Sequence, residues 1–263
     1  MLPQDEEKRN GKVRGRIRLQ RGGGWCILRG VGRAIRPVPV PAGPRSVRTE
    51  PSTPAEPMHT VVQHPLLQHR LAILRATKTD PKLFRELVHE MTRLIAFEAL
   101  RDLPTVPVSV RTPMGDAAGV KIEGHMVVAP ILRAGMGMLD PMLELLPYAT
   151  AGVIGTKRNE ETAEPIPYYL NLPKPFPDSY VALVDPMLAT GGSACDAIAT
   201  LKKNGFSRIV FLNIIACPEG IARVEREHPD VPVFTAAVDD HLNDRHYIVP
   251  GLGDAGDRLF GTL

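Results

Sequence analysis

The chain has 263 residues, of which 43% are hydrophobic and 5% aromatic, and its formal net charge is +3. This length allows a sizeable core in one or two domains, and scarce aromatic residues disfavour a nucleic-acid platform built on base stacking. No apolar stretch approaches the ~20 residues of a membrane-spanning helix, and the three cysteines form no C-x-x-C motif. We therefore expect a reduced, soluble, cytoplasmic protein with no zinc site, no disulfide framework and no membrane or nucleic-acid partner.

Residues 1–57 differ from the rest of the chain. They carry a net charge of +7, against −4 for the remainder, and they are dense in Gly and Pro without a sustained helical or strand period. We expect this basic extension to be disordered and the folded domain to span residues 58–263. Its role has three interpretations: a nucleic-acid-binding tail, a targeting peptide, or a dispensable extension from an upstream start codon. The acidic residues 5–7 and the lack of an apolar segment disfavour targeting.

The folded part opens with two predicted helices and a hairpin. Residues 66–76 have helical spacing, and the Asp-Pro pair at 80–81 supplies a cap and a first-turn proline for a second, amphipathic helix. Residues 106–110 alternate as in a strand, residues 113–116 form a turn, and a return strand lies near residues 120–122. The pair of strands predicts a projecting β-hairpin.

Apolar runs then alternate with helical patterns. The runs lie at residues 126–130, 149–154, 180–184, 209–216 and 231–238, and each has the composition of a buried strand. Strands that alternate with helices predict an α/β fold with a doubly wound parallel sheet and right-handed connections.

The run at 180–184 leads into a loop with the composition of a phosphate site. Asp185 marks the carboxyl end of this strand, where open α/β sheets bind ligands. The sequence ATGGS at 189–193 then precedes a helix. Adjacent glycines let backbone NH groups converge at the positive end of the helix dipole, while the Walker A spacing and its lysine are missing. A site for a single phosphate is favoured, and a plain tight turn is the alternative.

Three other segments carry charge or glycine next to strand ends. Arg133 follows the 126–130 run between small residues, and the charged residues 157–161 follow the 149–154 run. Residues 251–256 include three glycines, whose backbone groups could recognise the edge of a base. The alternatives are an ordinary surface cation, a solvated charged loop and a plain glycine-rich loop.

Four segments in consistent order resemble the uracil phosphoribosyltransferase family. They are PILRAG at 130–135, RNEET at 158–162, DPMLATGGS at 185–193 and YIVPGLGDAGD at 247–257. The resemblance begins at about Met58, which favours a dispensable or spurious extension before it. It implies the phosphoribosyltransferase type of sheet with a C-terminal base-binding hood. The implied reaction converts uracil and 5-phospho-α-D-ribose 1-diphosphate to UMP and diphosphate in pyrimidine salvage.

The resemblance also assigns residues to the sugar-diphosphate site. Arg133, Arg158 and Asp185 would bind this substrate and act in catalysis. The other contacts would come from the loop and the hood: Pro186, Met187, Leu188, Ala189, Thr190, Gly191, Gly192, Ser193 and Asp254. The cofactor would be Mg²⁺, held mainly through substrate oxygens and water rather than by direct protein ligands.

For the base, the resemblance implies that Ile248 packs the uracil ring. Gly253, Asp254 and Ala255 would then recognise its polar edge. The family resemblance further names GTP as a candidate activator, and we expect a homo-oligomer.

The sequence departs from the family pattern at two positions besides the extension. Lys157 replaces an aromatic residue often found before Arg158, and His246 stands where a glycine often precedes Tyr247. A competing hypothesis is a regulator that binds the sugar diphosphate or a nucleotide and then RNA. Conversion of uracil to UMP by the purified protein distinguishes the two.

Overall fold

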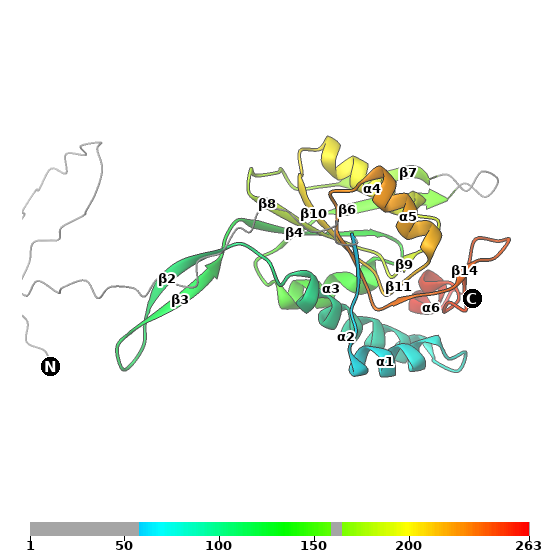
Figure 1. The fold of residues 1–263 in the computed structure, drawn as a ribbon, viewed down its shortest axis with the longest axis horizontal. Coiled ribbons are helices and arrows are strands. Elements are labelled where there is room, and N and C mark those ends of the chain that lie inside the picture. Colours follow the sequence, from blue (N-terminus) through cyan, green and yellow to red (C-terminus); the bar gives the residue numbers. More distant parts are fainter. Residues whose placement is uncertain (1–57, 159–164, 263) are drawn as a thin grey trace, which may run out of the picture. The chain divides into compact units, whose positions relative to one another are not determined.

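The computed structural model describes residues 58–158 and 165–262. Their centre is a sheet with helices on both of its faces (Figure 1). The expected disorder of residues 1–57 lies outside the described residues. Among the described helices, none is long and apolar enough to cross a membrane.

The main sheet is parallel except at one edge. Its order is β1-β12-β10-β8-β4-β6-β7, with β5 beside β4, and only the β6–β7 pair is antiparallel. The strands are β1 (His59–Val61), β12 (Val233–Thr235), β10 (Arg208–Leu212), β8 (Ser179–Val184), β4 (His125–Leu132), β6 (Val153–Arg158), β7 (Pro165–Asn171) and β5 (Thr150–Ala151). The predicted parallel sheet is confirmed, and the antiparallel edge strand β7 was not predicted.

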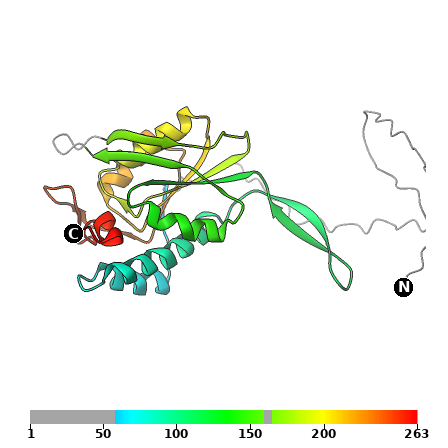
Figure 2. The same cartoon turned by 180° about the vertical axis from the view of Figure 1, so that it is seen from behind.

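Two helical layers cover this sheet, as Figures 1 and 2 show from opposite sides. One layer has α1 (Pro65–Arg75), α2 (Pro81–Ala99), α3 (Met136–Leu145) and α6 (Ala255–Phe260), and the other has α4 (Gly192–Lys203) and α5 (Pro218–Glu227). Successive side chains of a strand point to opposite faces. Thus Val181 and Leu183 of β8 pack with α4 and α5, whereas Ala182 and Val184 pack with the other layer. The doubly wound architecture is confirmed.

Three of the predicted strands are each broken in two. The 149–154 run forms β5 and then β6. The 209–216 run forms β10 and then β11 (Ile215–Ala216), and the 231–238 run forms β12 and then β13 (Ala237–Val238). The carbonyl oxygen of Pro186 accepts hydrogen bonds from the amides of both Ile214 and Ile215, at 3.0 and 3.1 Å. This contact diverts the chain from the main sheet, and β11 pairs instead with β13 and with β9 (Met187–Leu188).

The predicted hairpin and helix cap are both confirmed. Strands β2 (Thr105–Arg111) and β3 (Asp116–Ile122) pair antiparallel and project from the sheet (Figure 2). The Asp80 carboxylate accepts a hydrogen bond from the amide of Leu83 at 2.9 Å, which caps α2. Near the C-terminus, β14 (His241–Leu242) pairs antiparallel with β15 (Ile248–Val249), and residues 247–256, called the hood below, lead into α6.

Candidate active site

A cleft of about 630 Å³ lies at the carboxyl ends of β4 and β8. This is the edge of the sheet at which parallel α/β folds bind ligands. Its lining comes from the loop after β8, from the end of β4 and from the C-terminal segment: Arg133, Asp185, Met187, Leu188, Ala189, Thr190, Gly191, Gly192, Ser193, Ala194, Arg245, His246, Tyr247, Gly253 and Asp254. Three separate parts of the predicted site therefore meet in one place.

Parallel pairing brings Arg133 and Asp185 to the same edge. Pro130 of β4 lies opposite Val184 of β8, so the two residues follow neighbouring strand ends. The chain after Arg133 turns tightly at Gly135, where an added Cβ would lie 2.6 Å from the carbonyl oxygen of Val184. Only glycine lets the chain pass so close to both strand ends.

The loop before α4 presents the start of the helix to the cleft. Gly191 is the N-cap of α4 with φ +76, a conformation that favours glycine, and it provides no side-chain cap. The amide of Gly192 lies 3.4 Å from Oγ1 of Thr190, a weak contact. A helix start without a side-chain cap has amides and a positive dipole available for an anion.

The back of this loop is fixed by α5 and the residue before it. The carbonyl of Leu188 accepts from the amide of Cys217 at 3.1 Å, and the carbonyl of Ala189 accepts from the Cys217 thiol at 3.0 Å. Gly220 of α5 packs so closely that an added Cβ would lie 2.3 Å from the Ala189 oxygen. The loop carbonyls are thus bound on the side away from the cleft.

Asp185 is the group most altered by this environment. Burial raises the pKa of its carboxyl to about 7; a hydrogen bond from the amide of Met187 opposes the increase, and the negative charge of Asp254 adds to it. The Asp185 side chain accepts this bond at an Oδ1–N distance of 3.4 Å. Two carboxylates therefore share one partly desolvated cleft, an arrangement that favours a proton or a cation between them.

Arg133 connects the loop side of the cleft with the C-terminal helix. Its Nη2 donates to Oδ1 of Asp257 at 3.0 Å, and its guanidinium lies 6.0 Å from the ring centroid of Phe260. The Arg133 side chain remains 56% exposed, so it can still turn toward an anion in the cleft. Asp254 caps α6, since its Oδ1 accepts from the amide of Asp257 at 2.9 Å.

The structure divides the predicted residues into two groups. Arg133, Asp185, residues 187–193, Gly253 and Asp254 line the cleft. Three others are buried behind it and are not among its lining residues: Pro186, Ile248 and Ala255. The side chains of Arg158 and Lys157 lie outside the described residues, although the backbone of Arg158 ends β6, next to β4.

Sequence reasoning missed Arg245 and Tyr247, which line the cleft on either side of His246. Their loop is organised by Asn243, whose Oδ1 accepts from the amides of Arg245 and Tyr247, each at 3.0 Å. His246 has φ +60, which agrees with the expectation that a glycine would suit this position. An Asn that binds the backbone ahead of it is typical of a turn, and this signal could have identified the loop.

Comparisons with known proteins match the part of the chain that forms this site. The family profile described as uracil phosphoribosyltransferase matches residues 61–262. The chain is 53% identical over 203 residues to the uracil phosphoribosyltransferase of Streptococcus sanguinis (strain SK36), covering 77% of this chain and 97% of that protein. It is 52% identical over 203 residues, with the same coverage, to the uracil phosphoribosyltransferase of Streptococcus pyogenes serotype M1.

Solved structures agree with the fold. The AQ2163 protein from Aquifex aeolicus superposes with a TM-score of 0.74 at 37% identity, covering 77% of this chain and 97% of that chain. An adenine phosphoribosyltransferase from Leishmania donovani gives a TM-score of 0.50 at 13% identity, covering 72% and 87%, a likeness of fold alone. The predicted phosphoribosyltransferase type of sheet is therefore confirmed. With the profile match over residues 61–262, these likenesses show that the chain belongs to the uracil phosphoribosyltransferase family.

Proposed function

We propose that this protein transfers the phosphoribosyl group of 5-phospho-α-D-ribose 1-diphosphate to uracil, giving UMP and diphosphate. The observation that carries this proposal is a single cleft with a helix-start phosphate loop on one side and a glycine-rich hood on the other, in a chain of this family. The family match favours the enzyme over the RNA-binding regulator. The folded domain at 58–263 is proposed as the catalytic unit.

In this proposal, the phosphate loop holds the sugar's 5-phosphate. The start of α4 at Gly192 and the hydroxyls of Thr190 and Ser193 supply donors for its oxygens. The loop carbonyls are held on the far side by Cys217, so the anion meets amides rather than carbonyl oxygens. A phosphate fixed here positions the ribose for attack at its anomeric carbon.

The bond from ribose to diphosphate breaks as the base approaches, and positive charge develops on the sugar while negative charge leaves on diphosphate. Arg133 lies at the strand end beside Asp185 and is exposed to the cleft, which supports a role in binding the leaving group. Arg158 follows on the next strand, β6, and is proposed to act with it. Asp185 would accept hydrogen bonds from the ribose hydroxyls.

The carboxylate pair fits a divalent cation. Asp185 and Asp254 repel one another in the cleft, and this repulsion raises the pKa of Asp185 beyond the effect of burial. A Mg²⁺ ion bound with the diphosphate would neutralise its developing charge. Within the protein, Asp185 and Asp254 would hold this ion through water, because Mg²⁺ keeps several waters when it binds substrate phosphates.

The base is proposed to bind under the hood. Uracil has one NH donor between two carbonyl acceptors, so a selective site must offer donor, acceptor and donor. Gly253 and Asp254 face the cleft, and their main-chain groups can supply this pattern without a side chain in between. Ile248 and Ala255 are buried beneath them and would support the base-binding surface from behind.

The test is UMP formation by purified protein from uracil and the sugar diphosphate, with adenine, guanine, hypoxanthine and orotate in parallel. We expect turnover with uracil that requires Mg²⁺ and stops when the metal is chelated. Turnover with another base and none with uracil would overturn the assignment. Activation by GTP stays a prediction from the family resemblance, and adding GTP to the same assay measures it.

We also propose that the protein is a homo-oligomer in the cytoplasm. A hairpin of two strands is marginally stable in water, yet β2–β3 exposes apolar side chains, including Met114 at 97% and Val120 at 72%. A second copy would cover them. Cys195 and Cys217 are free thiols, which suits a reducing compartment.

A further inference from the structure

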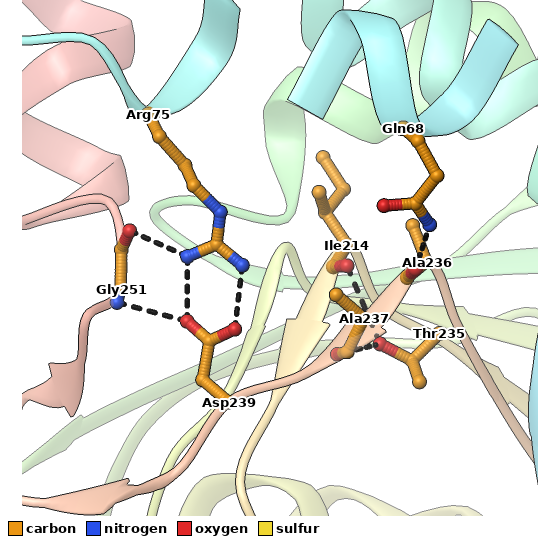
Figure 3. A network of polar contacts seen from close by, with 8 residues as sticks. All are labelled: Gln68, Arg75, Ile214, Thr235, Ala236, Ala237, Asp239 and Gly251. Atoms are coloured by element: carbon orange, nitrogen blue, oxygen red, sulfur yellow. Dashed lines mark hydrogen bonds and ion pairs between the residues drawn. The ribbon is translucent and has the colours of Figure 1, made fainter. Parts of the chain in front are cut away.

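The guanidinium group of Arg75 attaches the hood to helix α1 (Figure 3). Arg75, the last residue of α1, donates to Asp239 from Nη1 to Oδ2 at 2.6 Å and from Nη2 to Oδ1 at 2.5 Å. Its Nη1 also donates to the carbonyl oxygen of Gly251 at 2.7 Å. Asp239 Oδ2 in turn accepts from the amide of Gly251 at 2.8 Å. Both main-chain polar groups of Gly251 are therefore bound.

The contact between Arg75 and Asp239 is largely shielded from solvent and has a fixed geometry. The Asp239 side chain is 5% exposed and that of Arg75 23%, and a bidentate contact fixes the plane of both groups. The amide of Asp239 donates to the carbonyl of Ala216 at 2.8 Å. Gln68, also on α1, donates to the carbonyl of Ala236 at 3.2 Å. Helix α1 thus holds the segment after β12 at two points.

Gly251 is the fixed start of the glycine-rich part of the hood. It has φ +61, and an added Cβ would lie 2.1 Å from the carbonyl oxygen of Ile248. The next carbonyl, that of Leu252, accepts from Arg258 at 2.8 Å, and Arg258 also donates to the carbonyl of Ala76 at 2.7 Å. Two consecutive carbonyls are held by arginines immediately before Gly253 reaches the cleft.

From these contacts we infer that Arg75, acting through Asp239 and Gly251, is a positioning residue for recognition of the base. Arg75 is not among the residues that line the cleft, so we assign it no contact with either substrate. It sets the direction in which the peptides of Gly253 and Asp254 face the base. The inference rests on the proposed function, since it assumes that this backbone binds uracil.

The test compares KM for uracil with KM for the sugar diphosphate in wild type, Arg75→Met and Arg75→Lys. Arg75→Met removes all three hydrogen bonds, so KM for uracil should rise about ten- to hundredfold, because small misplacements of binding groups have effects of this size. KM for the sugar diphosphate should change less than about threefold, since most of its proposed contacts lie in the loop at 187–193 and only Asp254 belongs to the hood. Arg75→Lys keeps the charge but not the planar fork. Its KM ratio, KM for uracil divided by KM for the sugar diphosphate, should lie between those of wild type and Arg75→Met.

Arg85→Met is the matched control. Arg85 also extends from a helix and donates to a C-terminal carbonyl, that of Leu259 at 2.7 Å, but beyond the hood. Its KM ratio should equal that of wild type. The inference is overturned if Arg75→Lys, and Arg75→Met where it folds, keep the wild-type ratio, or if Arg85→Met shifts it equally. Absence of UMP formation by wild type would instead overturn the proposed function.

Discussion

The thiol of Cys217 donates a hydrogen bond to the carbonyl oxygen of Ala189 across an Sγ–O distance of 3.0 Å. Burial raises the pKa of this thiol to about 11, so it keeps its proton at neutral pH and can donate. Carbonyl and amide of one trans peptide point in opposite directions. The contact therefore directs the amide after Ala189 away from α5, and it fixes one side of the proposed phosphate loop.

From this relationship we expect Gly220 to affect substrate binding although it does not line the cleft. In Gly220→Ala, the new Cβ would meet the carbonyl oxygens of Ala189 at 2.3 Å and Leu188 at 2.8 Å. The loop must shift, and KM for the sugar diphosphate should rise by about tenfold or more. Gly115→Ala in the hairpin is the control, because nothing lies within 4 Å of its added Cβ. If steady-state kinetics give the same KM for the sugar diphosphate in both variants, the expectation is refuted.

Asp185 gives a prediction about stability and pH. Its folded-state pKa is about 7, above the ordinary 3.8, so the folded protein binds the proton more tightly than the unfolded chain. Stability should then be greatest below pH 4 as far as this group is concerned, and fall as pH rises toward 7. Asp185→Asn cannot ionise, so this loss of folding stability at higher pH disappears.

The substrate-free Asp185→Asn variant should thus be more stable than wild type at pH 8, by about 1 kcal/mol or more. The gain should be smaller at pH 5, while turnover falls at both pH values. Denaturant unfolding at the two pH values measures the difference. An equal gain at pH 5 and pH 8 would show that the titration of Asp185 is not its cause.

Local sequence patterns predicted the structural features that depend only on residues close together in the sequence. The cap at Asp80 and the loop ending at Gly191 were recognisable because their hydrogen bonds and dihedral angles are set within a few residues. Strand β1 has only three residues, His59–Val61, and exists because it pairs with β12 more than 170 positions away. No pattern within three residues could have predicted it.

The long-range contacts that hold the site residues in place could not be predicted from the sequence either. Cys217 and Gly220 reach the proposed phosphate loop from about 30 residues further along the chain, and Arg75 reaches Gly251 across 176 positions of the sequence. Such contacts depend on how helices pack over the sheet, which periodicity does not specify. Asp185 and the loop at 189–193 were predicted because ligands bind at the strand ends of a parallel sheet, and the other loop residues came from the family resemblance.

Arg158 remains a prediction from the family resemblance and can be tested by replacement. Arg158→Ala should raise the barrier by roughly 2.7–4 kcal/mol, as expected for loss of one donor to a developing charge. The effect should fall on use of the sugar diphosphate more than on uracil affinity. Arg208→Ala is the control, since Arg208 begins β10 at the opposite end of a strand in the same sheet. A change in uracil affinity alone would remove Arg158 from the proposed diphosphate site.

The hairpin gives a prediction about assembly. Val120→Glu places a charge on an apolar surface that is 72% exposed, and it should shift the protein toward a smaller species if a second copy covers this surface. Leu66→Glu, on α1 and 49% exposed, is the control for an added charge. Light scattering after size-exclusion chromatography measures the mass. A wild-type protein that is already monomeric would refute the homo-oligomer.

The division of the cleft between phosphate loop and hood is tested most directly by calorimetry on Gly253→Val. Gly253 has φ +81, a conformation that valine rarely adopts, although an added Cβ would have only Arg258 nearby, at 3.7 Å. Backbone strain rather than a clash should therefore displace the base-binding peptides. The account predicts that the variant still binds the sugar diphosphate at the loop from Thr190 to Ser193 and forms no UMP from uracil. Loss of sugar-diphosphate binding together with uracil use would contradict it, because the hood would then support the whole cleft and the base would be recognised elsewhere.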